Sequence, residues 1–356
     1  MKFENAIKSE RTREGYVYNL NRFLQWSKIK ESDGLVQLKD SYLQEIVEDY
    51  VIYLKGKLSP NSIRTTLAPL ELFFAMNDKN LNWKKIKKMY PARVKKSGED
   101  PYTTEDVQIM LNLAKTLRAR AIIHFLASTG CRVGVFDDLK MKHLSDMPDG
   151  CIMVKFYQGS IEEYYGFLIP EANKALQQYL DKRRQDGEVF SPESPVFRER
   201  YRVGGYNIRV MKSRNIKELV WGLLKRCSTT RVRIGMRYNI QLEHGFRKRF
   251  NTILKANDTV NLSLAEKLMG HQGVFQLDGT YFKPSVEQLF FEFRKHITNL
   301  TVDDSERLRL QVQLKDETIK KKESEKDLLI KDYGTRLSNS EKIIKRLSKR
   351  LDSLES

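Results

Sequence analysis

The sequence predicts a mainly α-helical chain with one small β-sheet (α+β): a helical N-terminal domain, a larger mixed domain and a C-terminal coiled-coil helix. Three observations predict this fold class. Apolar residues recur at spacings of three and four through most of the chain, which is the period of amphipathic helices. Short β-prone runs are confined to the region from Cys151 to Ile169, and the stretch after Asp304 carries a heptad pattern.

Residues 1–90 are predicted to form the helical N-terminal domain. Ser41 followed by Gln44 predicts a capping box at the start of the second helix, and Ser59 with Pro60 predicts the start of a third. We expect a polar loop around residues 31–34. The apolar faces of the first two helices are Tyr16, Leu20, Phe23 and Leu24, and then Leu43, Ile46, Val47, Tyr50, Val51 and Leu54.

Basic residues cover the polar faces of this domain and continue into the next segment. Such residues are either solvated helix faces or DNA contacts. A run rich in lysine starts at Lys84 and leads into residues 91–102, a predicted basic linker that contains Gly98 and Pro101 and is able to follow a phosphate backbone. The cations on the helices are Arg11, Arg13, Arg22, Lys55, Lys57 and Arg64.

The charge balance of the whole chain predicts a polyanionic partner. Among its 356 residues, Lys and Arg number 64 and Asp and Glu 46, giving a formal net charge of +18. No run approaches the roughly eighteen apolar residues of a membrane span, and the N-terminus lacks a signal-peptide core. We therefore expect a soluble protein that binds nucleic acid in the cytoplasm, at the nucleoid or in a host cell if the gene is viral. A merely soluble basic protein is the alternative.

The 3 cysteines and 5 histidines show neither a disulfide framework nor a zinc-binding spacing. Reduced thiols are expected, and neither a metal nor a cofactor.

Residues 103–302 are predicted to form the mixed domain, which is the catalytic domain. Thr103 with Asp106 predicts a capping box, and a buried helix over 119–129 ends at Gly130, a typical left-handed terminator. Two strands around a Gln-Gly-Ser turn follow from Cys151. Helices are expected over Glu171–Arg184, over most of 207–260, and from Val286 to near Leu300.

Residues 303–356 are predicted to form a coiled-coil tail. The upstream apolar residues Leu308, Val312 and Ile319 follow a less regular phase, which predicts a break near Ser324. A coiled coil needs another copy or a different protein as its partner. A lone charged helix is the alternative, since Gly334 lies inside the seam. The seam positions are Ile330, Tyr333, Leu337, Ser340, Ile344, Leu347, Leu351 and Leu354.

Five residues in the mixed domain have the chemistry to handle a phosphate. The guanidinium groups of Arg132 and Arg247 match two phosphate oxygens. His244 and His271 titrate near neutrality, although a lone histidine is often a cap or a packing residue. Tyr281 needs neighbouring cations to act as a nucleophile, since tyrosine has an ordinary pKa near 10. By default it is structural, as one of 16 tyrosines.

The order of these groups resembles the tyrosine recombinase, or phage integrase, family over about residues 10–300. The resemblance lies in Thr129-Gly-Cys-Arg132, His244-Gly-Phe-Arg247, Gly270-His271 and Tyr281. The amino-acid sequences of Val154–Ser160, Tyr164–Phe167 and Tyr281–Ser285 are more similar to archaeal integrases than to Xer-type members. That similarity suggests an archaeal chromosome, virus or mobile element.

The resemblance implies a site-specific DNA recombinase with a helical core-binding domain that helps to clamp double-stranded DNA. Arg132, His244, Arg247 and His271 would surround the scissile phosphate, and Tyr281 would attack it to form a 3′-phosphotyrosyl link and release a 5′-hydroxyl. Rejoining then needs neither ATP nor a metal ion, because the link conserves the phosphodiester energy. Recombination in this family generally uses four protomers, so a homotetramer in synapsis is implied.

Two positions depart from the family pattern. The lysine expected at the sheet turn, a general acid for the leaving hydroxyl, is replaced by Ile161, and Lys155 on the preceding strand is either its substitute or an ordinary strand lysine. The acidic residue expected after the first arginine is Val135, so Asp137 or Asp138 either orients Arg132 or is solvated. Two other functions stay open: a type IB topoisomerase-like enzyme, and a catalytically impaired DNA-binding or architectural protein.

Overall fold

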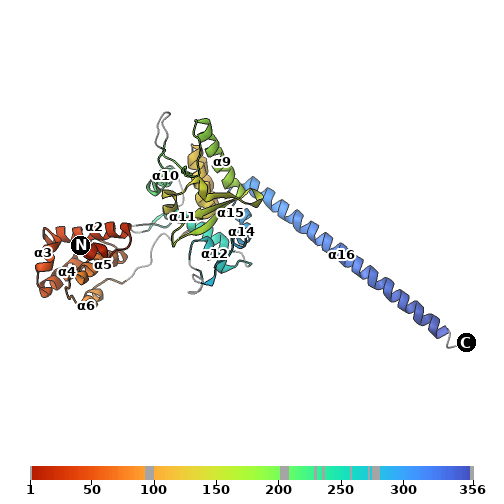
Figure 1. The fold of residues 1–356 in the computed structure, drawn as a ribbon, viewed down its shortest axis with the longest axis horizontal. Coiled ribbons are helices and arrows are strands. Elements are labelled where there is room, and N and C mark those ends of the chain that lie inside the picture. The colour runs from red at the N-terminus through yellow and green to blue at the C-terminus, as the bar shows by residue number, and fades with distance from the viewer. Residues whose placement is uncertain are drawn as a thin grey trace. The chain divides into compact units, whose positions relative to one another are not determined.

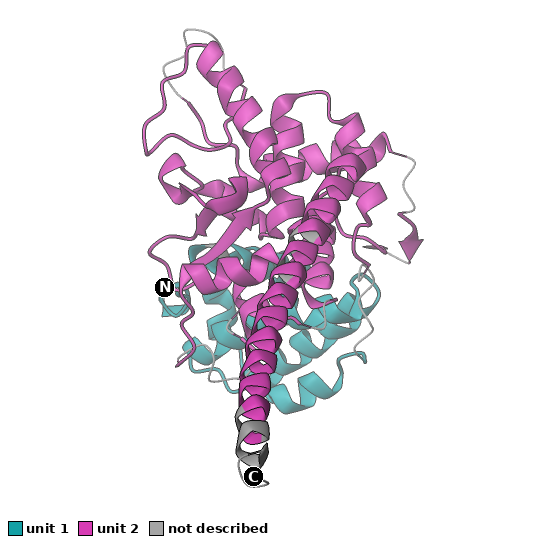
Figure 2. Ribbon diagram, turned by 90° about the vertical axis from the view of Figure 1, so that its right-hand side faces the viewer, with its two compact units in different colours: residues 1–96 teal, residues 97–356 magenta. Residues whose placement is uncertain are grey.

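The computed structural model describes residues 2–92, 100–200, 208–227, 231–234, 237–256, 259–271, 273–274 and 281–352. The chain divides into two compact units, residues 1–96 (unit 1) and residues 97–356 (unit 2), coloured separately in Figure 2. The predicted linker, residues 91–102, falls mostly on residues 93–99, which lie outside the described residues.

Unit 1 is a helical domain around one apolar core (Figure 1). Phe23, Val51 and Leu67 are fully buried in this core. Pro60 opens its helix with Ser59 as N-cap, as predicted. The helices are α1 (Lys2–Asn5), α2 (Glu10–Ser27), α3 (Ser32–Gln37), α4 (Asp40–Lys55), α5 (Pro60–Met76) and α6 (Trp83–Lys88).

Two local predictions in unit 1 are wrong. The expected loop at residues 31–34 is largely helix α3, because the fully buried Leu35 anchors this segment in the core. Helix α4 starts at Asp40 rather than at Ser41. Gln44 does not cap it, since its Oε1 accepts a hydrogen bond from the Asn82 backbone nitrogen, at 2.7 Å. Tertiary contacts override the local capping signal in both places.

Unit 2 combines helices with a three-stranded antiparallel sheet of order β1-β2-β3. The predicted hairpin is present as β2 (Ile152–Phe156) and β3 (Tyr164–Leu168), in a register that pairs Lys155 with Tyr165. The third strand, β1 (Leu144–Asp146), was not predicted, because three residues with mostly exposed side chains carry little periodic signal.

The buried helix α8 (Leu117–Thr129) is the centre of unit 2. It packs against α9 (Pro170–Gln185) and α11 (Leu242–Lys255), with Phe125 among its buried residues. Thr103 and Asp106 form the predicted capping box of α7 (Thr104–Leu113). The other helices are α10 (Ser213–Lys225), α12 (Leu262–Leu268), α14 (Val286–Arg294) and α15 (Ile297–Leu300), with short 3-10 turns at Val133–Asp137, Met141–His143 and Pro148–Gly150.

The region 207–260 is less helical than predicted. Between α10 and α11 the chain forms a short antiparallel pair, β4 (Arg233–Ile234) and β5 (Arg237–Tyr238). Asn239 fixes the base of this pair, since its Oδ1 accepts from the Val232 nitrogen at 2.8 Å and its Nδ2 donates to Asp100 at 3.0 Å. The sequence pattern that predicted helix here gives no sign of these contacts of Asn239 with Val232 and Asp100.

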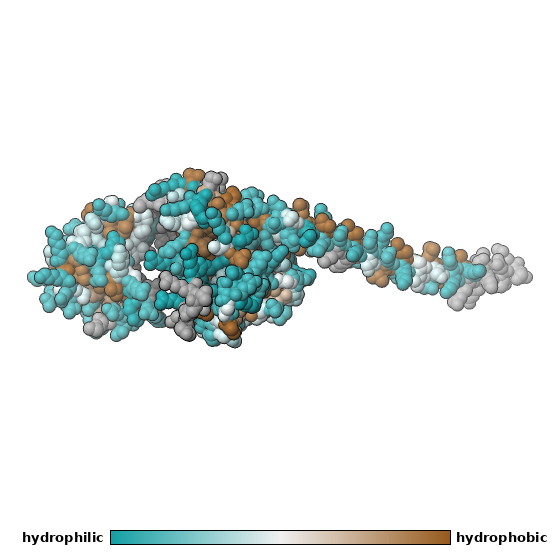
Figure 3. All heavy atoms as spheres, turned by 90° about the horizontal axis from the view of Figure 1, so that it is seen from above, coloured by the Kyte–Doolittle hydropathy of each residue, from teal (hydrophilic) through white to brown (hydrophobic). Residues whose placement is uncertain are grey.

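The tail is a single helix, α16 (Asp304–Asp352), of 49 residues. The backbone continues as a helix through Ser324, so the break predicted there is not an interruption of the helix. The shift in apolar spacing near Ser324 moves the apolar stripe to another face of the helix. It does not interrupt the helical backbone, because the segment lacks proline and is rich in the helix-forming residues Lys, Glu and Arg. Beyond Leu310 every side chain described in α16 is exposed, and apolar groups recur along the helix in Figure 3. Among the described helices, none is both long and apolar enough to cross a membrane.

Candidate active site

Gly130 joins the two arginine segments that the sequence singled out. It ends α8 in the left-handed conformation, with φ 54°. Its carbonyl oxygen accepts a hydrogen bond from Arg247 Nη1 at 2.9 Å. A Cβ on this glycine would lie 2.5 Å from the Cβ of Phe250, so α8 and α11 approach each other closely only because the residue is glycine.

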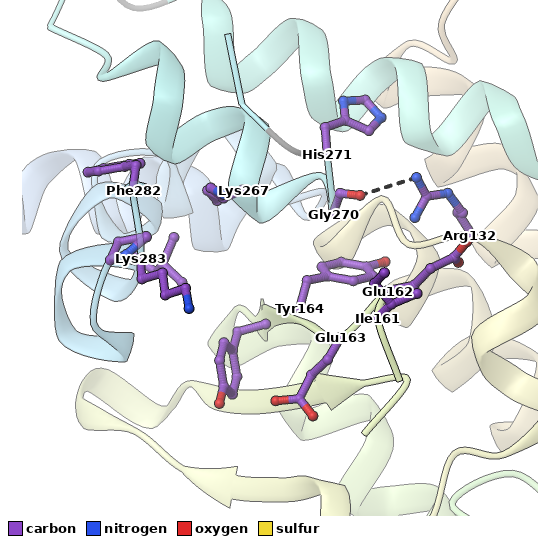
Figure 4. A pocket seen from close by; sticks show the side chains of 13 residues that line it. Arg132, Ile161, Glu162, Glu163, Tyr164, Lys267, Gly270, His271, Phe282 and Lys283 are labelled. Atoms are coloured by element: carbon purple, nitrogen blue, oxygen red, sulfur yellow. Dashed lines mark hydrogen bonds between the residues drawn. The ribbon is translucent and has the colours of Figure 1, made fainter. Parts of the chain in front are cut away.

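Arg132 follows this turn and is held by a second left-handed glycine. Its Nη2 donates to the carbonyl oxygen of Gly270 at 3.2 Å, as the dashed line in Figure 4 shows. Gly270 has φ 65°, and a Cβ there would meet the ring of Tyr164 at 2.7 Å. Each arginine is thus positioned by the backbone carbonyl of a glycine from a distant segment: Arg132 by Gly270 and Arg247 by Gly130.

Arg247, His271 and Glu266 form a chain of hydrogen bonds beside Arg132. Arg247 is only 7% exposed, and its Nη2 donates to the Met269 carbonyl and lies 2.9 Å from His271 Nε2. The His271 Nδ1 lies 2.5 Å from a carboxylate oxygen of Glu266. Since arginine has only donors, His271 Nε2 accepts and its Nδ1 carries the proton given to Glu266.

The protonation of the two partners of His271 follows from their surroundings. Burial lowers the pKa of Arg247, although the guanidinium stays charged near neutrality. Burial alone would raise the pKa of Glu266, but hydrogen bonds from Lys255 and His271 outweigh burial and lower it. Glu266 is therefore a carboxylate, and it fixes the orientation of the imidazole ring.

Arg132, Gly270 and His271 line one side of a pocket of about 740 Å³. Figure 4 shows Tyr164 and Glu163 from the β2–β3 hairpin below them, and Phe282 and Lys283 on the opposite side. The pocket combines positive charge with the wall of an aromatic ring, which suits a phosphate and its sugar. Its acidic and basic lining residues are Arg132, Lys267, His271, Lys283, Glu162 and Glu163.

Lys155 lies beside this pocket rather than in its lining. Its Nζ is 3.0 Å from a carboxylate oxygen of Glu163, which does line the pocket. The hydrogen bond with Glu163 is the main cause that raises the pKa of Lys155. Ile161, at the turn where the family lysine is expected, is fully exposed and lines the pocket. The nearest lysine of the hairpin is thus held by a carboxylate from the same turn.

His244 and Tyr281 are not brought into the pocket. His244 is exposed in the first turn of α11, one turn before Arg247. Tyr281 is 80% exposed, and neither residue is among the described lining residues, although Phe282, Lys283 and Pro284 are. The structure therefore brings together Arg132, Arg247 and His271, with the tyrosine segment at the edge of the pocket.

The predicted acidic partners of Arg132 have other roles. Both carboxylate oxygens of Asp137 accept from Ser213, at 2.6 Å and 3.0 Å, at the start of α10. Asp138 is 3.6 Å from Lys140. The proposal that one of them orients Arg132 is wrong, because the Gly270 carbonyl does so.

Sequence reasoning also missed Glu266, Lys267 and Lys283. Glu266 lies five positions before His271, and it faces the ring only because the chain turns at Gly270. Lys267 and Lys283 are two lysines among many in a basic chain, and they are distinguished only by the pocket that they share.

The chain combines a helical unit with a mixed unit in which two arginines and a histidine meet beside a small sheet. Together with its relatives, this arrangement defines the chain as a tyrosine recombinase, an enzyme that cuts and rejoins DNA. The chain belongs to the phage integrase family: the model described as "Phage integrase family" matches residues 102–287. The family predicted from the sequence is confirmed.

The curated relatives include the tyrosine recombinase XerC of Lactobacillus delbrueckii subsp. bulgaricus and that of Lactobacillus leichmannii. Each is 26% identical over 269 residues, which cover 72% of this chain and 83% of the relative.

Solved structures share the fold at low sequence identity. The Tn1549 transposon integrase in complex with a circular intermediate DNA has a TM-score of 0.53 and 16% identity, covering 81% of this chain and 94% of that one. The XerH site-specific recombinase bound to its difH substrate has a TM-score of 0.50 and 17% identity, covering 78% of each chain. The predicted α+β fold is confirmed.

Proposed function

We propose that this recombinase cleaves double-stranded DNA with Tyr281 as nucleophile, in the pocket lined by Arg132 and His271. The observation that carries the proposal is that Arg132 and His271 line one pocket, with the Tyr281 segment at its edge and with Arg247 buried behind His271 and in contact with it. The site-specific activity rests on the family, and the roles of the residues rest on this geometry.

Arg132 and Arg247 would bind the non-bridging oxygens of the scissile phosphate. Paired guanidinium donors match phosphate oxygens and neutralise the charge that develops in the transition state. The contact of Arg132 with Gly270 is a single hydrogen bond of 3.2 Å at the pocket wall, which a phosphate oxygen can replace. His271 would bind the same phosphate through Nε2 only after that nitrogen gains a proton, because its Nδ1 proton is given to Glu266. His244 would approach the phosphate from the first turn of α11.

Tyr281 would move from its exposed position to attack the phosphorus. The Tyr281 hydroxyl gives its proton to His244, acting as general base, and its oxygen forms a bond to phosphorus. The bond from phosphorus to the 5′ oxygen breaks, and a general acid gives a proton to that oxygen. The product is a 3′-phosphotyrosyl link and a free 5′-hydroxyl. Another strand's 5′-hydroxyl reverses the step, so rejoining consumes no ATP, and arginines supply the positive charge that a metal ion supplies elsewhere.

We assign the proton of the leaving group to Lys155. It is the lysine nearest to the hairpin turn, and it would have to exchange its partner Glu163 for the 5′ oxygen. An ion pair at the edge of a hydrated pocket is weak enough for that exchange, since such pairs contribute about 0–1 kcal/mol.

Unit 1 is proposed to bind the duplex as the core-binding domain, together with the catalytic domain of residues 103–302. The net charge of +18 supports a DNA partner. Part of the basic run is neutralised within the unit, since Lys85 pairs with Glu48 and Lys87 with Glu71. Arg13 on α2, Lys55 at the end of α4 and Lys57 in the turn after it are therefore better candidates for phosphate contacts.

Assembly and origin extend the proposal. We propose a homotetramer during synapsis, self-association or partner binding through the coiled-coil tail of residues 303–356, and nucleoid association. The amino-acid sequence around Tyr164 and Tyr281 supports an archaeal or mobile-element origin. A flanking tRNA gene fragment would indicate integration, a flanking inverted repeat would indicate transposition, and neither would be expected for a chromosomal resolvase.

Covalent capture on nicked duplex DNA tests the nucleophile. Tyr281→Phe is expected to abolish the protein–DNA adduct, and Tyr42→Phe, an exposed tyrosine of unit 1, is expected to retain it. Undiminished adduct from Tyr281→Phe would refute the assignment. Tight DNA binding by the unmodified protein without cleavage of any substrate would instead indicate an architectural protein.

A further inference from the structure

We propose that the C-terminal part of α16 pairs with the same segment of a second copy, as a parallel, in-register, two-stranded coiled coil that starts at Ile330. This inference rests on the proposed function, in which the tail of residues 303–356 binds another copy or a different protein. It specifies that the partner is a second copy and that the two helices are parallel. It rests on the exposed apolar seam and on the charges that flank it, and it is independent of the chemistry of the pocket.

The seam is a continuous unpartnered stripe in the described part of the helix. Ile330, Tyr333, Leu337, Ile344 and Leu347 are each between 56% and 66% exposed. They alternate at spacings of three and four with Ser340, and Leu351 and Leu354 continue the spacing in the sequence. The stripe therefore spans about three and a half heptads, which reaches the three to four that a stable coiled coil needs.

The seam has a defined start. In the same register, each a position back to Arg309 is charged, namely Glu323, Asp316 and Arg309, and the d position nearest to Ile330 is Lys326. The apolar d residues Ile319 and Val312 are thus flanked by charges that cannot be buried between two helices. Pairing is thus confined to residues after Leu329. The first part of α16 would remain a single helix, an arm of about 40 Å at 1.5 Å per residue.

The residue types at the seam favour two strands. With Ile330 at position a, the a positions are Ile330, Leu337, Ile344 and Leu351, and the d positions are Tyr333, Ser340, Leu347 and Leu354. Isoleucine at a with leucine at d favours parallel dimers, and the heptad of Ile344 and Leu347 has this pair. One polar core residue fixes the register at some cost in stability. Ser340 is that polar residue, and it would face its own copy across the dimer.

The flanking charges favour the parallel orientation. Arg336 at a g position would face Glu341 of the second copy at the next e position, and the sequence repeats this pair with Arg350 and Glu355. In an antiparallel pair, g faces g and e faces e, so arginines would face arginines and glutamates would face glutamates. Arg336 also contacts Asp332 of its own helix at 3.1 Å, which leaves further donors for the partner.

A parallel coil would hold two catalytic units at the same end of the dimer. Each unit would stay on its own arm, so the link would raise the local concentration of one protomer at the other without fixing their contact. Two such dimers contain the four protomers that the proposed synapsis requires.

Sedimentation of the full chain without DNA tests the pairing, with two variants matched in exposure. Leu337 lies in the seam at 65% exposure, and Leu328 lies outside it, at position f, at 66%. We expect the unmodified protein and Leu328→Glu to sediment as dimers at micromolar concentration and Leu337→Glu as a monomer. A monomeric unmodified protein, or equal behaviour of the two variants, would overturn the proposal.

Cross-linking tests the orientation. In a Cys227→Ser background, whose other cysteines Cys131 and Cys151 are buried, Tyr333→Cys adds a thiol at a d position near the start of the seam. A parallel dimer places the two thiols together and forms a disulfide on oxidation, whereas Lys331→Cys at position b should not. Efficient cross-linking of Lys331→Cys only, or of neither variant, would refute parallel pairing. Tyr281→Phe should dimerise normally, so the two proposals fail independently.

Discussion

Arg247 Nη2 lies 2.9 Å from His271 Nε2, and this contact defines which ring nitrogen of the histidine carries the proton. Because the guanidinium only donates, His271 presents its lone pair to Arg247 and its Nδ1 proton to Glu266. Arginine, histidine and glutamate therefore act as one unit. A phosphate that enters the pocket would compete with His271 for the donors of Arg247.

Glu266 is expected to act as a positioning residue through His271. Glu266→Ala should slow single-turnover cleavage roughly 10- to 100-fold, since a hydrogen bond to a charged group contributes about 1.5–3 kcal/mol. Glu266→Gln, which keeps an acceptor, should lose less. The rate of adduct formation measures the effect of each variant. In a His271→Ala background, Glu266→Ala should cause no further loss of rate. An equal further loss in that background would show that Glu266 acts by another route.

Lys155 is expected to be needed only when the leaving group needs a proton. Lys155→Ala should slow cleavage of ordinary DNA by about 10²- to 10⁴-fold, the usual range for general acid catalysis. It should have little effect on a substrate with a 5′ sulfur leaving group, because a thiol with a pKa near 8.5 departs without a proton. Lys174→Ala, an exposed lysine on α9, is the control.

The same pair of substrates also separates Lys155 from Lys283. Suppose that Lys283→Ala slows cleavage of ordinary DNA but not of the 5′ sulfur substrate, and that Lys155→Ala slows neither. Lys155 is then an ordinary strand lysine held by Glu163. Lys283, one of two lysines in the described pocket lining, would then supply the proton.

Gly130 is expected to tolerate no side chain. Gly130→Ala combines a positive φ with a contact of 2.5 Å to Phe250, so it should destabilise unit 2 by about 2–4 kcal/mol, strain and overpacking together. Gly187→Ala is the matched control, because Gly187 has φ 86° with no heavy atom within 4 Å of an added Cβ. Chemical unfolding should give a much smaller loss for it. Similar losses would show that the backbone angle alone is responsible.

His124 is expected to make unit 2 less stable in mild acid. Burial lowers the pKa of its imidazole to about 4, whereas the unfolded value is near 6.5. The unfolded chain therefore binds more protons between those values, and stability is lost as the pH falls from about 6.5 towards 4. At pH 5 the loss should be up to about 2 kcal/mol relative to pH 7.

Unfolding at both pH values, for the unmodified protein and for His124→Gln, measures that contribution. The variant should show a smaller difference between the two pH values, although not zero, because burial also lowers the pKa of His296. An unchanged difference would exclude His124 as the source.

The sequence predicted features that depend on residues a few positions apart. The capping box of Thr103 with Asp106, the left-handed end of α8 at Gly130 and the β2–β3 hairpin are local, so their signals lie within one short window. The order of the arginines, histidines and tyrosine also indicated the family, which the comparisons confirm. Ser41 and Asp137 failed as predictions because their neighbourhoods are completed by residues far along the chain.

Only the tertiary structure decided what the site residues contact. Arg132 and Gly270 are 138 positions apart, and Arg247 and Gly130 are 117 apart, so no local pattern encodes these hydrogen bonds. The same holds for the use of Asp137 as a cap for α10 and for the exposure of Tyr281. The physical reason is that a phosphate site needs converging donors, and convergence is a property of packed helices rather than of residue spacing.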